Sequence, residues 1–257
     1  MTSIDTTPGA GTTAVPAVRD RLIVALDQPD LESALRHVDR IGDAVGWYKV
    51  GLQLYAAAGR SAVESLTDRG KRVFLDLKLH DIPATVEKAI RALTDLPVSL
   101  LTVHAAGGPE MLSAAAGAAR SLPSKPRVLG VTMLTSLDGS EIPPLWNPRT
   151  SLEEKVLGLA LLCADSGVDG VIASPQELRP LRSAHPSPFL IVTPGIRGPA
   201  DAANDQKRTL SLPEAIARGA DYVVVGRPVL EAADPRGVVA AYEAAVTASI
   251  HSERTGT

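Results

Sequence analysis

The segment RVFLDLKLHDIPAT, residues 72–85, joins a strand-like apolar run to the expected start of a helix. Valine, phenylalanine and leucine favour a strand in its first part, and Pro83 suits the first turn of a helix. Asp76, Lys78 and Asp81 also lie within this one segment. Charges cost free energy to bury unless they are paired or used. The segment therefore belongs either to a surface salt-bridge ladder or to an active site.

Strand-like runs of this kind recur along the chain. Nearly continuous apolar runs are typical of strands covered on both faces, as in parallel sheets. Helical patterns separate them, including one after Asp30, which suits an N-cap, and one over residues 54–70 that is expected to end at Gly70. The runs cover residues 21–27, 46–51, 72–80, 99–105, 127–134, 169–174, 188–196 and 221–229. Their alternation with helices predicts an α/β fold, a single-domain (β/α)8 TIM barrel, with an open doubly wound sheet as the alternative.

Composition limits the classes of protein to which the chain can belong. Of its 257 residues, 45% are hydrophobic and 21% charged, as in ordinary globular domains. A net charge of −3 and an aromatic content of 3% argue against a nucleic-acid partner. A membrane span needs about 18 consecutive apolar residues, and no apolar run is that long. Cys163 is the single cysteine, which favours a reducing, cytoplasmic location. Its apolar helical setting favours an inert buried thiol over a nucleophile.

The two ends of the chain are expected to lie outside the folded domain. Residues 1–18 are rich in Thr, Ala, Gly and Pro and lack the basic and apolar regions of a signal peptide, so we interpret them as a disordered leader. The barrel is expected to span residues 19–250, and residues 251–257 to form a frayed tail.

Polar side chains gather where the predicted strands end, which is where such barrels place their active sites. Strand alternation sends Asp76 and Lys78 to one side and the intervening leucines to the other, toward the helices. With Lys49 and Asp27 nearby, acids and bases could alternate, and such a network keeps each ammonium protonated. This pattern favours an active site over the salt-bridge ladder. Further polar residues at strand ends are Asp81, His104, Thr135, Ser136, Arg197 and Arg227, with Gly226 next to Arg227.

The last two strand runs indicate a phosphate site. The motif VVVGRPVL offers the backbone N–H of Gly226, the guanidinium of Arg227 and Pro228 at the start of a helix. Loops after the seventh and eighth strands commonly bind phosphate in these barrels. Arg197 and Gln206 are joined by a loop rich in Gly, Pro, Asp and Asn, which is either a closing lid or a flexible surface loop.

The order of these residues resembles the orotidine 5′-phosphate decarboxylase family. The resemblance extends from about residue 21 to about residue 245 and rests on Asp27, YKVG, DLKLHDIPAT, TVHAAGG, VTMLTS, TPGIR, Gln206 and VVVGRPV. It implies conversion of orotidine monophosphate to uridine monophosphate (UMP) and CO₂, the last step of de novo pyrimidine nucleotide biosynthesis. It also implies that the reaction needs neither an organic cofactor nor a metal.

The resemblance further implies a role for each site residue. Lys78 is expected to protonate C6 of the pyrimidine, and Asp76 to face the substrate carboxylate. Lys49 and Asp81 are expected to complete the charge network, with Asp81 and Thr85 reaching the neighbouring site of a homodimer. The other expected substrate-binding residues are Asp27 at the ribose, Thr135 at the pyrimidine, Ile82, and Arg197, Gln206, Gly226 and Arg227 at the phosphate.

Two alternatives remain open. Mg²⁺-dependent sugar-phosphate enzymes, such as 3-keto-gulonate 6-phosphate decarboxylase and hexulose phosphate synthase, resemble this family and share its Asp-x-Lys-x-x-Asp pattern. They place a carboxylate where Lys49 stands, because the cation needs oxygen ligands. The other alternative is a non-catalytic nucleotide-binding barrel, although a binder gains little from paired charges aimed at a leaving carboxylate.

Overall fold

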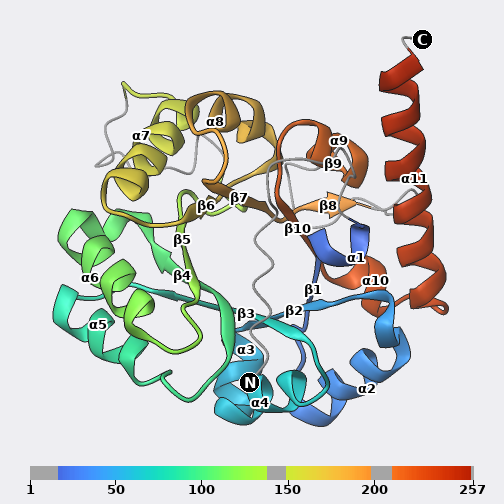
Figure 1. Cartoon of the computed structure of the whole chain (residues 1–257), viewed down its shortest axis with the longest axis horizontal. Coiled ribbons are helices and arrows are strands. Elements are labelled where there is room, and N and C mark those ends of the chain that lie inside the picture. Colours follow the sequence, from blue (N-terminus) through green and yellow to red (C-terminus); the bar gives the residue numbers. More distant parts are fainter. Residues whose placement is uncertain (1–16, 138–148, 198–209, 256–257) are drawn as a thin grey trace.

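Eight parallel strands form a closed barrel at the centre of the molecule (Figure 1). The computed structural model describes residues 17–137, 149–197 and 210–255. Around the barrel the strands follow the order β1-β10-β7-β6-β5-β4-β3-β2. Their bounds are β1 Leu22–Ala25, β2 Trp47–Gly51, β3 Arg72–Leu79, β4 Val98–His104, β5 Arg127–Val131, β6 Gly170–Ile172, β7 Leu190–Thr193 and β10 Tyr222–Val225. Each strand overlaps one predicted run, so the predicted (β/α)8 barrel is confirmed and the open sheet is wrong.

Helices surround the barrel and cover its outer face (Figure 1). The α-helices are α1 Val18–Arg21, α2 Leu31–Ile41, α3 Leu52–Ala58, α4 Arg60–Thr67, α5 Pro83–Arg91, α6 Gly108–Ser121, α7 Leu152–Asp165, α8 Leu178–Ala184, α9 Leu212–Ala217, α10 Arg227–Leu230 and α11 Pro235–Thr255. Short 3₁₀ turns are η1 Gly42–Ala44, η2 Ala105–Gly107 and η3 Pro175–Glu177, and the strands β8 Ile196–Arg197 and β9 Leu210–Ser211 form a small parallel sheet.

Local sequence signals explain where several helices begin. The Asp30 carboxylate accepts a hydrogen bond from the backbone N–H of Ser33 at 2.7 Å and caps α2, as its sequence predicts. Ser151 and Ser211 start capping boxes at α7 and α9. Pro83 is the first residue of α5. These caps fix the angle at which each helix leaves the loop that follows a strand.

Some expected boundaries differ from those in the structure. The pattern over residues 54–70, interpreted as one helix, is divided between α3 and α4, because Gly59 adopts φ +56° and interrupts the helix. Helix α11 continues to Thr255, past the expected end of the barrel domain. Val18, expected in the leader, begins α1 and is buried, whereas residues 1–16 lie outside the described residues.

Side chains inside the barrel alternate with side chains packed beneath the helices. The inner cluster comprises Ile23, Ala25, Trp47, Phe74, Leu100, Leu129, Val192 and Val224. Neighbouring residues on the same strands, such as Val24 and Leu75, belong to the larger outer cluster. The inner cluster fills the barrel, so the next inward positions toward the strand ends, including Lys49 and Asp76, face its mouth.

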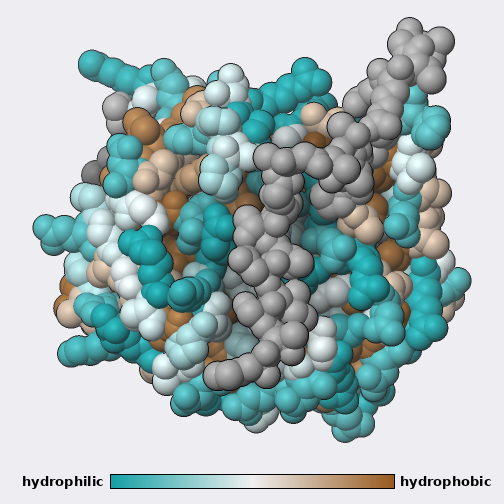
Figure 2. Space-filling model, in the orientation of Figure 1, coloured by the Kyte–Doolittle hydropathy of each residue, from teal (hydrophilic) through white to brown (hydrophobic). Residues whose placement is uncertain are grey.

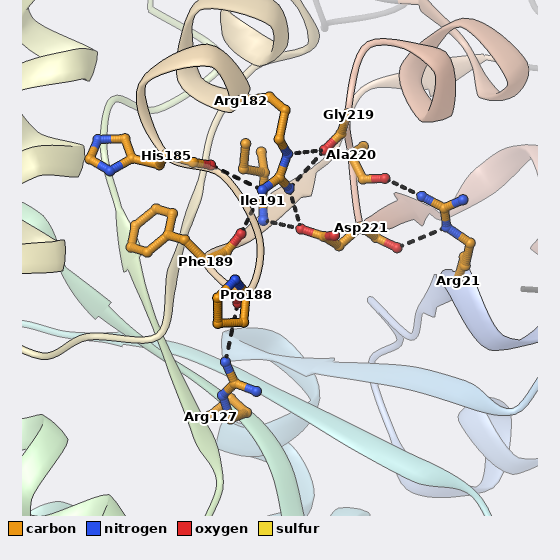
Figure 3. A network of polar contacts seen from close by, with 10 residues as sticks. All are labelled: Arg21, Arg127, Arg182, His185, Pro188, Phe189, Ile191, Gly219, Ala220 and Asp221. Carbon is orange, nitrogen blue, oxygen red and sulfur yellow. Dashed lines mark hydrogen bonds and ion pairs between the residues drawn. The ribbon is translucent and has the colours of Figure 1, made fainter. Parts of the chain in front are cut away.

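An arginine network lies at the opposite end of the barrel, where β7 and β10 begin (Figure 3). Arg182 of α8 donates hydrogen bonds to the carbonyls of Phe189 at 2.8 Å and Gly219 at 2.9 Å, and pairs with the Asp221 carboxylate. The same carboxylate accepts from the backbone N–H of Ile191 at 2.7 Å. One guanidinium thus ties α8 to the segments that enter β7 and β10.

We expect Arg182→Ala to lower the free energy of unfolding by about 2–4 kcal/mol, because it leaves several partly buried polar groups unpaired. Arg36→Ala is the control: Arg36 pairs with Glu32 on one exposed helix face, and such pairs contribute less than about 1 kcal/mol. Urea unfolding followed by circular dichroism measures both variants. Equal, small losses would show that the network contributes little to stability.

Hydrophilic side chains cover most of the periphery in the view of Figure 2, and hydrophobic residues appear mainly in the crevices between them. Within the three described ranges, no helix is both long and apolar enough to cross a bilayer. The large hydrophobic side chains exposed in this part of the chain are Leu52, Ile82, Leu134 and Leu161.

Candidate active site

Four charged side chains, one that follows β1 and three in β2 and β3, form a connected network at the mouth of the barrel. Lys49 Nζ lies 3.0 Å from Asp27 Oδ1 and 3.5 Å from Asp76 Oδ2. Lys78 Nζ lies 2.8 Å from the same Asp76 oxygen. Acidic and basic side chains therefore alternate through the network, in the order Asp27, Lys49, Asp76 and Lys78. This is the pattern that the sequence predicts.

Gly51, at the end of β2, leaves room for this network. A Cβ atom at this position would lie 2.7 Å from Lys49 Nζ and 2.9 Å from Asp27 Oδ1. These separations are too short for a side-chain carbon, so a larger residue displaces one of the two charges. The glycine of the YKVG motif thus has a steric role beside the site.

Strand β3 departs from regular geometry at the lysine. It pairs with β4 through Leu75 and Leu101 and next through Leu79 and Val103, so three residues of β3 face one residue of β4. Within this bulge Lys78 adopts φ +50°, a left-handed conformation that is uncommon for residues other than glycine. Simple strand alternation therefore does not describe the segment. The bulge and the left-handed residue together place the ammonium beside Asp76.

Asp76 is ionised at neutral pH despite its burial. Burial alone would raise the pKa of this carboxyl, but Lys49 and Lys78, with hydrogen bonds from Lys78 and Thr102, bring the pKa below its usual value. Its residual exposure is 7%. A buried carboxylate that keeps its charge holds the neighbouring ammonium groups in place through the ion pairs that they form with it.

The network lines a cavity of about 720 Å³, a size typical of small-molecule sites. Apolar side chains of the barrel interior, including Phe74 and Ile172, form part of its wall. The sequence-predicted site residues that line it are Asp27, Lys49, Asp76, Lys78, Thr135, Gly226 and Arg227. The ends of β1, β2, β3 and β10 therefore converge with the segment after β5 on one cavity.

The remaining predicted residues lie elsewhere. Asp81, Ile82 and Thr85 are exposed and do not line the cavity of their own chain. Arg197 lies in β8, and the structure describes its backbone only. Gln206 lies outside the described residues.

Several residues near the site were not predicted from the sequence. Gln28, His37 and Glu231 line the cavity. Thr102 of β4 is fully buried and bonds to both Asp76 and Lys78. The inward position of Thr102, two residues after Leu100 on a mostly apolar strand, was the one signal that could have identified it. No motif marks the other three residues.

His104, which the sequence left open, does not line the cavity. Its ring centroid lies 5.1 Å from that of His80. Burial, with His80 and Lys78 nearby, lowers the pKa of His104, so the imidazole is neutral at pH 7. It therefore adds no charge to the network.

Fold and site together define a (β/α)8-barrel enzyme with a charged site at the carboxyl ends of its strands. A sequence model described as the orotidine 5′-phosphate decarboxylase / HUMPS family matches residues 20–242. The chain belongs to this family.

Individual relatives agree with this assignment. The orotidine 5′-phosphate decarboxylase of Moorella thermoacetica is 46% identical over 222 residues, which cover 84% of this chain and 88% of that protein. The enzyme of Nitrosococcus oceani is 44% identical over 229 residues, covering 89% and 98%. The crystal structure of the Lactobacillus acidophilus enzyme superposes with a TM-score of 0.78 at 38% identity, covering 88% of this chain and 99% of that one.

Proposed function

We infer that this chain is a carboxy-lyase that converts orotidine 5′-monophosphate to UMP and CO₂. The observation that carries the inference is the ammonium of Lys78, held 2.8 Å from the Asp76 carboxylate on the wall of the cavity. The high identity to enzymes named for this activity supports the same conclusion.

The charge network suits the chemistry of this decarboxylation. Breaking the bond between C6 and the carboxylate releases CO₂ and leaves the electron pair on C6, in the plane of the ring, where no carbonyl group can accept it. We propose that the Lys78 ammonium stabilises this carbanion and transfers its proton to C6, after which solvent reprotonates the amine. Preorganised charge of this kind is usually the largest single contribution to catalysis.

Asp76 and Lys49 support this step in the proposed mechanism. Asp76 pairs with Lys78 and keeps its ammonium on the cavity wall, and the charge of Asp76 lies where the substrate carboxylate would leave. Lys49 bridges Asp76 and Asp27, and it contacts only one oxygen of Asp27. The second oxygen of Asp27 can accept hydrogen bonds from ribose hydroxyls. Thr135, on the cavity wall, is the proposed contact to the pyrimidine.

Product analysis tests this function. Purified protein is incubated with orotidine 5′-monophosphate, and the products are separated by liquid chromatography while CO₂ is trapped and counted. We expect UMP and CO₂ in equal amounts. Binding of the nucleotide without turnover would instead indicate a non-catalytic barrel.

The Mg²⁺-dependent sugar-phosphate reaction is disfavoured by Lys49. Its ammonium lies between Asp27 and Asp76, where a cation would need oxygen ligands, and it would repel a metal at that point. Among the described residues, no cluster of three or more His, Cys, Asp or Glu side chains has the geometry of a metal site.

We propose that Gly226 and Arg227 bind the substrate phosphate, together with Arg197 and Gln206. Arg227→Ala is expected to raise KM about 10- to 150-fold, because a hydrogen bond between charged groups contributes about 1.5–3 kcal/mol. Orotidine, which lacks the phosphate, provides the comparison: wild type and variant should convert it at similar kcat/KM. Steady-state kinetics with both substrates measures the difference, and an equal loss with orotidine would exclude a phosphate contact.

We also propose a homodimer in which Asp81 and Thr85 reach the neighbouring site. Their exposure supports this, as do Ile82 and Leu52, which are 66% and 60% exposed after the adjacent strands β3 and β2. Sedimentation should show a dimer for wild type, and an inactive monomer for Ile82→Asp. Leu161→Asp, on the exposed face of α7, is the control and should stay dimeric. A fully active monomer would contradict the proposal.

A cytoplasmic location completes the proposal. Cys163 is fully buried, and burial raises the pKa of its thiol to about 12, which makes it an inert packing residue. This supports the interpretation of the thiol but not, by itself, the location. Fractionation of cells expressing the protein at its natural level tests the location directly.

A further inference from the structure

We propose that Thr102 is a positioning residue that holds Asp76 and Lys78 in their reactive arrangement. This inference rests on the proposed decarboxylation, in which the two residues act on the substrate. Thr102 does not line the cavity and has no direct path to the substrate. Its effect on the reaction passes through the two side chains beside it.

The hydroxyl of Thr102 joins the acid to the backbone of the base. It donates a hydrogen bond to Asp76 Oδ1 at 2.9 Å and accepts one from the backbone N–H of Lys78 at 2.9 Å. The directions are fixed, because an ionised carboxylate only accepts and a backbone N–H only donates. Thr102 is completely buried, so water does not compete for these bonds.

The position of Thr102 in the sheet explains why the bulge needs it. Between the Leu75–Leu101 and Leu79–Val103 pairs, Thr102 is the single residue of β4 opposite three residues of β3. The regular ladder is interrupted there, so the Lys78 N–H lacks the strand partner that a regular sheet would provide. The threonine hydroxyl takes the place of that partner.

The same bond supports the unusual conformation of Lys78. A lysine at φ +50° is strained, and such strain persists only where the surrounding structure holds it. Thr102 fixes the N–H of this residue, and through Asp76 Oδ1 it also sets the plane of the carboxylate. The other oxygen, Oδ2, is then directed at Lys78 Nζ and Lys49 Nζ, 2.8 Å and 3.5 Å away.

Thr102→Val tests the proposal, because valine keeps the shape of threonine and removes the hydroxyl. We expect kcat to fall about 10- to 100-fold, since a small displacement of a reacting group costs about that much. The affinity for UMP, measured by calorimetry, should change less than about threefold, because the phosphate and ribose contacts are untouched. Thr102→Ser restores the hydroxyl and should keep kcat within about threefold of wild type.

Thr132→Val is the matched control. Thr132 is also buried near the end of a strand, but its hydroxyl bonds to the carbonyl of Ile172 at 2.9 Å and away from the network. We expect this variant to keep wild-type kcat. If Thr102→Val does not fold, Thr102→Ala replaces it in the same comparison.

Three results would overturn the proposal: a kcat for Thr102→Val within twofold of wild type, an equal loss in Thr102→Ser, or an equal loss in Thr132→Val. A crystal structure of Thr102→Val gives a readout that does not depend on activity. We expect Lys78 to leave its left-handed conformation or Asp76 to rotate, and an unchanged arrangement would count against a positioning role. Failure of the wild type to convert orotidine 5′-monophosphate would refute the proposed function instead, and the crystal structure would still test the contact.

Discussion

Lys78→Ala should lower kcat by at least about 10⁴-fold, the largest effect expected of any single substitution in this chain. In the proposed mechanism, the change removes both the charge that stabilises the carbanion and the proton that C6 receives. Proton donation by a positioned group contributes about 10²–10⁴-fold, and a fixed charge about 10²–10³-fold more. The loss should appear in kcat, while UMP still binds through the phosphate and ribose contacts. Single-turnover kinetics with excess enzyme measures the chemical step directly.

Lys125→Ala is a close control for this experiment. Lys125 is exposed and also has a left-handed backbone, with φ +44° compared with +50° at Lys78. Lys125 lies outside the cavity, so its replacement tests the effect of removing an ammonium from a lysine in this backbone conformation. We expect wild-type kcat. Turnover at the wild-type rate by Lys78→Ala would show that the proton comes from another group.

Asp76→Asn should lower kcat about 10³-fold, because it removes the charge that pairs with Lys78 and orients its ammonium. The amide can still accept the hydrogen bond from Thr102, but its NH₂ group cannot pair with an ammonium. Lys78 and Lys49 then face each other without a carboxylate between them, so the two ammonium groups repel each other. Single-turnover kinetics with excess enzyme measures the loss.

Asp43→Asn is the matched control for the carboxylate. Asp43 Oδ1 pairs with the buried Lys71 ammonium at 3.1 Å, near the N-terminal end of β3 and away from the cavity. The substitution breaks another acid–lysine pair and should leave kcat unchanged. If both variants lose activity equally, the effect belongs to stability and not to the site.

The sequence was sufficient to predict the barrel and the charged side chains that meet at its mouth. Apolar runs covered on both faces identified the eight strands, because burial on two sides leaves little room for polar residues. Charges at the ends of these runs then had to converge, since parallel strands in a barrel all end at one rim. Asp27, Lys49, Asp76 and Lys78 could be placed together by this argument alone.

Other features depended on details that periodicity does not encode. The bulge at Lys78 follows from the register between β3 and β4, and neither strand shows it in its own pattern. Thr102 is a buried polar residue in a mostly apolar strand, and its role appears only when Asp76 and Lys78 are beside it. His37 lines the cavity from α2. The spacing of apolar residues in this helix predicts which face is buried, but it does not predict which side chains reach a cavity at the strand ends.

The initial rate of chelated protein on orotidine 5′-monophosphate tests the central claim most directly. That claim is that a preorganised network of side-chain charges performs the decarboxylation. The protein is dialysed against EDTA, and UMP formation is followed with and without added Mg²⁺. We expect the wild-type protein to have the same rate in both conditions. Lys78→Ala should lose this activity. No turnover without Mg²⁺, followed by full recovery when it is added, would contradict the account.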